Sequence, residues 1–199
     1  MNVGWLALTA AGAVILGGSV AGALGPAITA REARVFHAIN GLPGWLYWPL
    51  WPPMQLGNLV VGTIVGLIAA WVVGDLAMAI GVVVAMVLKL VVERFVRRKM
   101  AAHLQIRQRP GTSEVDAILR GSDVPSSGAS FPSGHVILVA AISCVVVPAM
   151  PAAWWWVPAL LTLLVMVGRV YVGAHNPLDV AAGLGAGLLV GGVLASFVR

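Results

Sequence analysis

The chain has 199 residues, of which 60% are hydrophobic and only 10% are charged. A soluble domain of this size carries about a quarter of charged residues, so the composition excludes an ordinary soluble protein and indicates a polytopic membrane protein. We interpret residues 1–199 as one transmembrane domain. The net charge of +5 favours an anionic partner, such as a lipid headgroup or a phosphate. Nucleic acid is not an expected partner, because the basic residues lie at the edges of apolar runs.

Six apolar runs each approach the length that a bilayer requires. They cover approximately residues 3–24, 54–73, 76–95, 134–147, the segment from Trp154 to Arg169, and 177–198. The first run lacks a basic leading segment, so we expect it to be a membrane span and not a cleaved signal. The sequence therefore predicts an all-α fold, a bundle of six transmembrane helices with short interfacial helices. Glycines of the last run are expected to allow close helix contact: Gly183, Gly185, Gly187, Gly191 and Gly192.

Short polar segments separate these runs. Thr29 and Glu32 are spaced as in a capping box, which predicts a short helix that ends at Gly41. Residues 42–53 mix aromatic residues with prolines, which argues against a long helix and indicates a belt at the level of the lipid headgroups, or alternatively the border of a lipid entrance. In the long polar segment 96–130, Ser113–Gly121 predicts a short helix over the site.

The stretch Ser130-Phe131-Pro132-Ser133-Gly134-His135 opens the fourth apolar run. Ser133 can cap the helix, and the free N–H groups of the first helical turn form a site for an anion. Gly134 has no side chain that would keep a bulky anion away from the backbone, and His135 supplies an acid or base near neutral pH. A capped helix with an interfacial histidine is the structural alternative.

A second stretch, residues 168–179, lies at the edge of another span. His175 and Asp179 are four residues apart, so a carboxylate can orient the imidazole and stabilise its cation. Arg169 adds a guanidinium suited to phosphate. The structural alternative is a snorkelling Arg169 beside a local His175–Asp179 hydrogen bond. Cys144 is the single cysteine and no carboxylates cluster with the four histidines, so we expect no disulfide, metal or cofactor.

Counting spans places the candidate residues on one membrane face, because the third run leads to that face, the fourth leaves it and the fifth returns. These candidates are Lys89, Arg109, Ser133, His135, Arg169, His175 and Asp179.

The two stretches, Pro132-Ser133-Gly134-His135 and Arg169-x5-His175-x3-Asp179, resemble two signature motifs of the type 2 phosphatidic acid phosphatase family. The third signature, normally Lys-x6-Arg-Pro, is altered here. Lys89 stands at the expected end of the third run, but six residues on lies Val96-Arg97, and an Arg-Pro pair occurs only at Arg109-Pro110. We favour Arg109 as the phosphate ligand, because it keeps its proline, with Arg97 as the alternative. For Lys89, an ion pair with Glu93 is the alternative to phosphate binding.

The resemblance implies a metal-independent phosphatase that acts on a lipid in the plasma membrane. By resemblance, His175 is the nucleophile that forms a phosphohistidine, Asp179 orients it and His135 protonates the leaving group. The implied phosphate ligands are Lys89, Arg109, Ser133, Gly134 and Arg169.

The substrate remains open among a polyprenyl diphosphate, phosphatidic acid and phosphatidylglycerol phosphate. Transfer of the phosphate to another lipid or a sugar, and a non-catalytic lipid carrier or scramblase, are the alternative functions. The positive-inside rule would put the site in the cytoplasm, whereas the resemblance favours the outer face, which we prefer.

Overall fold

The computed structural model describes residues 3–25, 28–99 and 107–198. Their secondary structure is helical, apart from one isolated antiparallel bridge between Gln108 and Ala129. The helices are α1 (Val3–Ala23), α2 (Ala30–Asn40), η1 (Gly44–Leu46), α3 (Tyr47–Gln55), α4 (Leu59–Val73), α5 (Leu76–Lys99), α7 (Pro110–Ser113), α8 (Gly134–Val146), η2 (Val147–Ala149), η3 (Ala152–Trp154), α9 (Trp156–Tyr171) and α10 (Pro177–Ala195). The predicted all-α class agrees with this structure.

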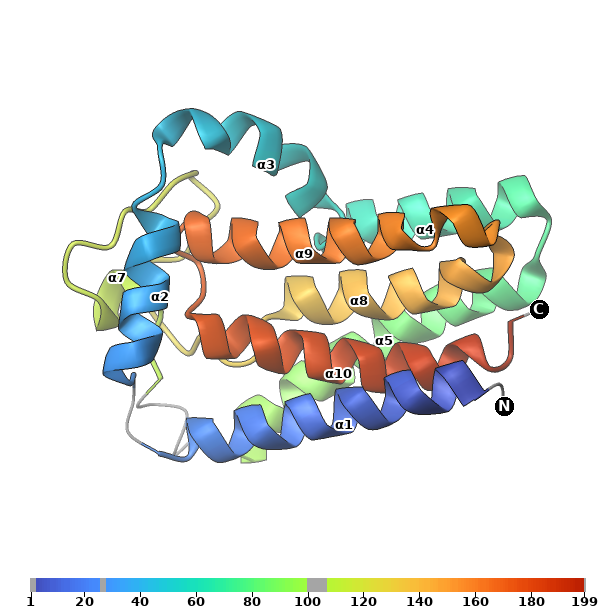
Figure 1. The fold of residues 1–199 in the computed structure, drawn as a ribbon, viewed down its shortest axis with the longest axis horizontal. Coiled ribbons are helices and arrows are strands. Elements are labelled where there is room, and N and C mark those ends of the chain that lie inside the picture. Colours follow the sequence, from blue (N-terminus) through green and yellow to red (C-terminus); the bar gives the residue numbers. More distant parts are fainter. Residues whose placement is uncertain (1–2, 26–27, 100–106, 199) are drawn as a thin grey trace.

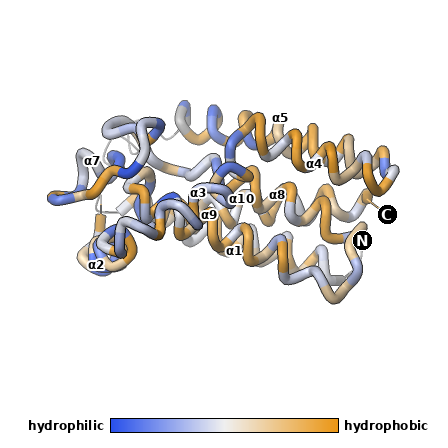
Figure 2. Tube along the Cα trace, turned by 90° about the horizontal axis from the view of Figure 1, so that it is seen from above, coloured by the Kyte–Doolittle hydropathy of each residue, from blue (hydrophilic) through white to orange (hydrophobic). Residues whose placement is uncertain are grey.

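The long helices lie side by side, and the short helices α2 and α7 lie at one end of the bundle (Figure 1). α8 is central, since it packs against α4, α5, α9 and α10 and most of its residues are buried. α1 covers the outer side of α10, and both ends of the chain lie at the end of the bundle opposite α2 and α7. The bundle is apolar along its length, whereas hydrophilic residues concentrate around α2 and α7 (Figure 2).

The predicted count of six spans is not confirmed. Within the described residues, four helical segments are long and apolar enough to cross a membrane: Gly4–Ala23, Leu76–Val96, Ala152–Tyr171 and Pro177–Ala195. A fifth candidate is the pair Gly44–Gln55 and Leu59–Val73, which is bent by 60°. α8 has only 13 residues, because the polar stretch before it and Pro148 after it limit its length. Neighbouring helices bury α8, so its length does not have to equal the thickness of the bilayer.

The glycines of α10 allow the close helix contacts that the sequence predicts. A Cβ on Gly183, Gly187 or Gly191 would lie within 3 Å of atoms of Ser133 or of α8. These three positions recur every four residues, so they form one face of α10. Gly185 lies on another face, where a Cβ would come within 3 Å of the α1 backbone. α10 therefore packs closely on two neighbours at once.

The short interfacial helix α2 forms as predicted, and Thr29 caps it by accepting the Glu32 N–H at 3.2 Å. At its other end, the buried Asn40 side chain accepts the Ile118 N–H at 2.8 Å and donates to the carbonyls of Ile118 and Tyr171, each at 2.9 Å. These bonds occupy the polar groups of the Ile118 peptide that a helix would use.

The predicted helix over Ser113–Gly121 is therefore wrong. The only helical turn in this part of the loop is α7, which ends at Ser113, and Asp116 has a positive φ of 64°. Arg120 then fixes the loop to the bundle, because it donates to the Tyr171 carbonyl at 2.7 Å and its guanidinium lies 4.2 Å from the centre of the Tyr171 ring. The loop thus closes the polar end of the bundle without a helix of its own.

Candidate active site

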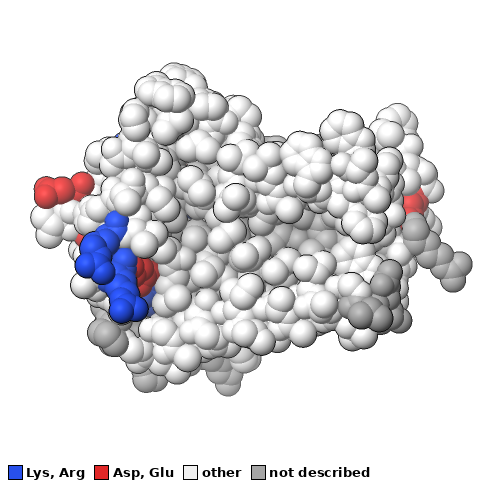
Figure 3. Space-filling model, in the orientation of Figure 1, with Lys and Arg blue, Asp and Glu red and all other residues white. Residues whose placement is uncertain are grey.

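The ends of three helices and the second half of α5 bring the predicted site residues together. Ser133 precedes α8, Arg169 lies in the last turn of α9 and Asp179 lies in the first turn of α10, while Lys89 faces them from α5. The Ser133 N–H donates to the Asp179 carbonyl oxygen at 3.0 Å, so the starts of α8 and α10 are joined directly. The structure places this group at the polar end of the bundle, where the charged side chains also gather (Figure 3).

The start of α8 has the form of an anion site. Ser133 occupies the N-cap position, but its hydroxyl does not cap the helix as the sequence suggests. Its Oγ is fully buried and has no hydrogen-bond partner among the described residues. An unsatisfied buried hydroxyl costs free energy, so a ligand oxygen at this point would be stabilised by Ser133 and by the N–H groups of the first turn.

Gly134 faces α5 at close range. A Cβ there would lie 2.8 Å from Lys89 Cε and would collide with the carboxylate of Glu93, so a larger residue would displace these two side chains. Lys89 Nζ and Glu93 Oε2 form an ion pair at 2.9 Å. The ion pair expected as the alternative for Lys89 thus exists, and it lies directly against the start of α8. A phosphate bound to that helix end would also be within reach of Lys89.

A glycine turn positions His175 between α9 and α10. Gly173 has a φ of 77°, a left-handed conformation that favours glycine after a helix end. The N–H groups of Ala174 and His175 donate to the Arg169 carbonyl oxygen at 3.1 and 3.2 Å. A Cβ on Gly173 would lie 2.8 Å from the Ile118 carbonyl oxygen. The close approach of the covering loop, residues 107–130, therefore also requires a glycine here.

His175 is buried, with its Nδ1 3.8 Å from Asp179 Oδ2. This separation is longer than a hydrogen bond, and Nδ1 has no hydrogen-bond partner among the described residues. Burial and the nearby charges of Arg169 and Arg109 lower the pKa of His175, against the opposing effect of Asp179. The imidazole is therefore neutral at neutral pH, which leaves a ring nitrogen with a lone pair for attack on an electrophile.

Both carboxylate oxygens of Asp179 are held by hydrogen bonds. Oδ2 accepts the Asn176 N–H at 2.9 Å, and Oδ1 accepts from Arg107 Nε and Nη2 at 3.2 and 3.1 Å. The Arg107 guanidinium also donates to both oxygens of Glu32, at 2.6 and 3.2 Å. Arg107 was not among the predicted site residues, and Glu32 was expected only as part of a helix cap. The available signal was the spacing of two arginines in Arg107-Gln108-Arg109-Pro110.

Arg109 reaches the same region. Backbone hydrogen bonds join residues 107–109 to residues 128–130 in an extended pairing. Because side chains alternate along extended backbone, Arg107 and Arg109 point to the same side. Arg109 Nη1 donates to the Ala174 carbonyl oxygen at 2.8 Å, directly before His175. The alternative, Arg97, lies in α5, and its side chain is outside the described part of the chain.

Arg169 is buried, and its Nε has no hydrogen-bond partner among the described residues. The charges of Arg169, Lys89 and Arg109 all lie near enough to His135 to act on it. The negative charge of Asp123, in the loop of residues 107–130, lies near the Arg169 guanidinium. Asp123, Arg169 and His135 together line a small pocket. The site therefore gathers cations around His135, with a carboxylate at its mouth.

A separate apolar groove lies near this small pocket. It has a volume of about 120 Å³ and lies between α4, α8 and α9, beginning at Leu56 and Val139. Val139 is four residues after His135 and lies on the same face of α8. The groove therefore begins about one helical turn below His135, toward the middle of the bundle.

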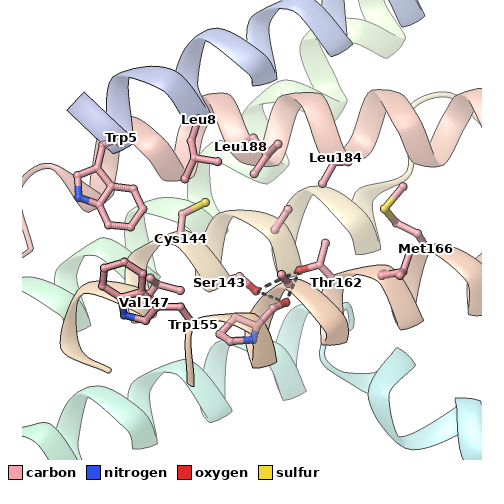
Figure 4. A pocket seen from close by; sticks show the side chains of 15 residues that line it. Trp5, Leu8, Ser143, Cys144, Val147, Trp155, Thr162, Met166, Leu184 and Leu188 are labelled. Atoms are coloured by element: carbon pink, nitrogen blue, oxygen red, sulfur yellow. Dashed lines mark hydrogen bonds between the residues drawn. The ribbon is translucent and has the colours of Figure 1, made fainter. Parts of the chain in front are cut away.

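A second, larger cavity of about 680 Å³ lies among α1, α8, α9 and α10 (Figure 4). Trp5 and Trp155 lie at one end of it and Met166 at the other. Met166 and Leu184, which line it, pack against the core cluster around Phe36. Most of its lining is apolar, and it shares only Ser143 and Pro158 with the lining of the groove below His135.

Comparison with known proteins adds the family. The sequence profile of the PAP2 superfamily matches residues 75–199, which include every predicted site residue. The chain belongs to the PAP2 superfamily. This membership and the apolar helices mark it as a multi-pass membrane protein and support phosphatase activity, and the family resemblance stated from the sequence is confirmed.

Two solved structures share the fold of this PAP2 chain. LpxE from Aquifex aeolicus has a TM-score of 0.64 and 22% identity, with 84% of this chain and 96% of that chain covered. A PAP2-type phosphatidylglycerolphosphate phosphatase from Bacillus subtilis has a TM-score of 0.70 and 19% identity, with 97% of this chain and 94% of that chain covered. At these identities the likeness shows the fold alone.

A curated relative, an undecaprenyl-diphosphatase from Sulfolobus acidocaldarius, is 42% identical over 55 residues. The match covers 27% of this chain and 26% of that relative, so this PAP2 chain aligns with only about a quarter of the relative's length. Because the match is this short, the relative's activity is not assigned to this chain and only suggests a substrate to test.

The positions of the two arginines lead to a prediction. We expect Arg109→Ala to lower turnover by roughly two to three orders of magnitude, because it removes a donor beside His175, and Arg97→Ala to change it little. Steady-state kinetics of both purified variants on one lipid phosphate would measure this. The opposite ranking would assign the phosphate contact to Arg97 and leave Arg109 as a loop residue.

Proposed function

We propose that this PAP2 protein hydrolyses a phosphomonoester or diphosphate group on a membrane lipid through a phosphohistidine intermediate. One observation carries the proposal: Ser133 Oγ and Arg169 Nε are buried without hydrogen-bond partners among the described residues, in a site that they share with His175. Donors kept in place before a ligand arrives suit the charged oxygens of a phosphoryl group, because no reorganisation is needed when charge develops.

The proposed cradle for the phosphate combines side chains and backbone. Lys89, Arg109 and Arg169 supply positive charge, Ser133 supplies its hydroxyl, and the Gly134 N–H lies at the positive end of α8. These groups can balance the charge of the phosphate themselves, so the proposed mechanism uses no cofactor.

In the proposed first step, the Nε2 atom of His175 attacks phosphorus, because Nδ1 is directed toward Asp179. The P–N bond forms as the bond from phosphorus to the leaving oxygen breaks, which is the lipid oxygen of a monoester or the bridging oxygen of a diphosphate. His135, protonated beside the bound phosphate, donates its proton to that oxygen. In the second step, water attacks phosphorus, the P–N bond breaks and the proton of the water passes to His135. Inorganic phosphate leaves, and both histidines return to their starting states.

The groove below His135 is our candidate for the lipid tail. The small pocket at the site is bordered by Tyr47 and Trp51 of α3, which supports the interpretation of this aromatic segment as a lipid entrance. The groove between α4, α8 and α9 begins about one helical turn from His135 and lies in the apolar part of the bundle. A headgroup at His135 and a tail in the groove would satisfy both ends of an amphipathic substrate.

The first test is an assay of purified protein in detergent against a polyprenyl diphosphate, phosphatidic acid and phosphatidylglycerol phosphate. We expect phosphate release from at least one of them, unchanged by a chelator and inhibited by vanadate, which mimics the five-coordinate phosphorus of the transition state. Loss of activity in chelator with recovery in magnesium would contradict the mechanism. Transfer of the phosphate to an added alcohol, in place of release, would indicate a phosphotransferase.

The second test separates the two histidines. We expect His175→Ala to form no phosphoenzyme with any substrate, because the attacking atom is gone. His135→Ala should recover part of its activity with a nitrophenyl phosphate, whose leaving group needs little protonation. Rapid-quench trapping of acid-labile phosphohistidine in both variants measures the difference. Phosphoenzyme in His175→Ala but not in His135→Ala would exchange the roles, and none in an active wild type would favour direct attack by water.

The third test concerns the groove. Ala69→Phe should lower kcat/KM for a long-chain lipid phosphate by about tenfold, because the ring fills space that the tail needs. It should leave hydrolysis of a short, water-soluble phosphate ester unchanged. Ala159→Phe, which projects from the lining of the larger cavity, is the matched control and should change neither activity. An effect of Ala159→Phe alone would assign the tail to the larger cavity.

A further inference from the structure

A chain of buried charges extends behind the proposed nucleophile. It runs from Glu32 through Arg107 to Asp179, which faces His175. The side chains of Glu32, Arg107 and Asp179 are 9%, 1% and 0% exposed, so water contributes little to their solvation. Buried charges persist only when partners with good geometry compensate them, so this arrangement is specific and not a surface coincidence.

Glu32 contacts Arg107, which binds the Asp179 carboxylate, and also the backbone of the residue that precedes Asp179. Its carboxylate accepts two hydrogen bonds from Arg107, and Oε1 also accepts the N–H of Leu178 at 2.9 Å. Leu178 directly precedes Asp179 in the first turn of α10. A single carboxylate of α2 therefore fixes the guanidinium that holds Asp179 and also the backbone from which Asp179 projects.

The balance of charge explains why a second carboxylate is needed. Burial alone would lower the pKa of Arg107, but the hydrogen bond to Glu32 and the charges of Asp179 and Glu32 raise it, so Arg107 is a permanent cation. With Arg107 and Asp179 alone, the two charges would cancel, and no net negative charge would face His175. Glu32 restores a net charge of −1 to the group, which can stabilise His175 when the imidazole becomes cationic.

We propose that Glu32 and Arg107 are positioning residues for the reaction: Arg107 orients Asp179 toward His175, and Glu32 offsets the charge of Arg107 so that Asp179 keeps its effect on the imidazole. This inference rests on the proposed function, in which His175 is the nucleophile. Neither residue touches the phosphate in this assignment, because Lys89, Arg109 and Arg169 form the cradle.

The place of α2 in the fold makes this assignment physically reasonable. Phe36 lies one helical turn beyond Glu32 and is fully buried in the core cluster with Val136 and Val180. α2 packs against α9 and α10, the two helices that flank His175. A short interfacial helix anchored at this cluster thus brings its first turn to the site, and a helix is a rigid support for a charge that must be placed within a fraction of an ångström.

The experiment compares Glu32→Gln and Arg107→Lys with the control Glu114→Gln. Glu114 is a carboxylate of the same polar end, paired with His37 at 3.3 Å, so its change to glutamine is chemically matched but lies outside the group. All three are purified in detergent, and their thermal unfolding is recorded. Each is then assayed on the same lipid phosphate for kcat, KM, vanadate inhibition and the rate of phosphoenzyme formation.

We expect Glu32→Gln and Arg107→Lys to lower kcat and the rate of phosphoenzyme formation by about ten- to a hundredfold, as for other small displacements behind a reacting group. KM and vanadate inhibition should change by less than about threefold, because the cradle is intact. The control should match the wild type in every measurement.

The pH profile gives a readout that a purely structural role would not change. Groups that face His175 are Asp179 of α10, Arg169 of α9, Arg109 of the loop and His135 of α8. Loss of the Glu32 charge makes this surrounding more positive and lowers the pKa of His175 further. The acid limb of kcat should therefore move to lower pH in Glu32→Gln and should not move in Glu114→Gln.

Several outcomes would overturn the inference. One is a folded Glu32→Gln variant with the kcat and pH profile of the wild type. Another is a loss of activity that only follows the folded fraction, or failure of both variants to fold while the control folds, which would make the pair structural. Absence of phosphoenzyme in an active wild type would instead contradict the proposed function, so the two failures are distinguishable.

Discussion

The buried guanidinium of Arg107 is the constraint around which the polar end of this protein is arranged. A cation with 1% of its side chain exposed requires compensation, and Glu32 and Asp179 provide it from two different helices. Because the partners lie 75 and 72 residues away along the chain, their pairing joins α2, the covering loop and α10. The same contacts determine where Asp179 points, so the stability of this end and the geometry of the proposed nucleophile have one physical origin.

The rest of the bundle keeps this end in place. α8 is surrounded by four helices, and the glycine face of α10 brings α10 close to it. The start of α8 is thereby fixed against α10 through the Ser133 N–H and against α5 at Gly134. In this arrangement, the hydroxyl of Ser133 and the Nε of Arg169 are buried without a hydrogen-bond partner in the part of the chain that the structure describes, and in our proposal they bind the oxygens of a ligand.

Much of the local structure could be predicted from the sequence, because it depends on neighbouring residues. The short helix α2, its Thr29 cap and the close contacts of the α10 glycines follow from spacing and residue type alone. The helix expected over Ser113–Gly121 does not form, because the side chain of Asn40, far away in the chain, binds the N–H and the carbonyl of Ile118. Helix propensity depends on the local sequence and cannot predict such a distant partner.

By itself, the sequence determined the membrane class, the family and the identity of the residues proposed for the chemistry, because composition and motif spacing are local properties. Only the tertiary structure showed that Arg109 reaches the carbonyl directly before His175, because that contact depends on how the polar segment between α5 and α8 folds back over the bundle. It also showed that Glu32, expected only in a helix cap, is a partner of Arg107. Long-range pairing of buried charges depends on how the helices pack in space, and spacing along the chain carries no information about it.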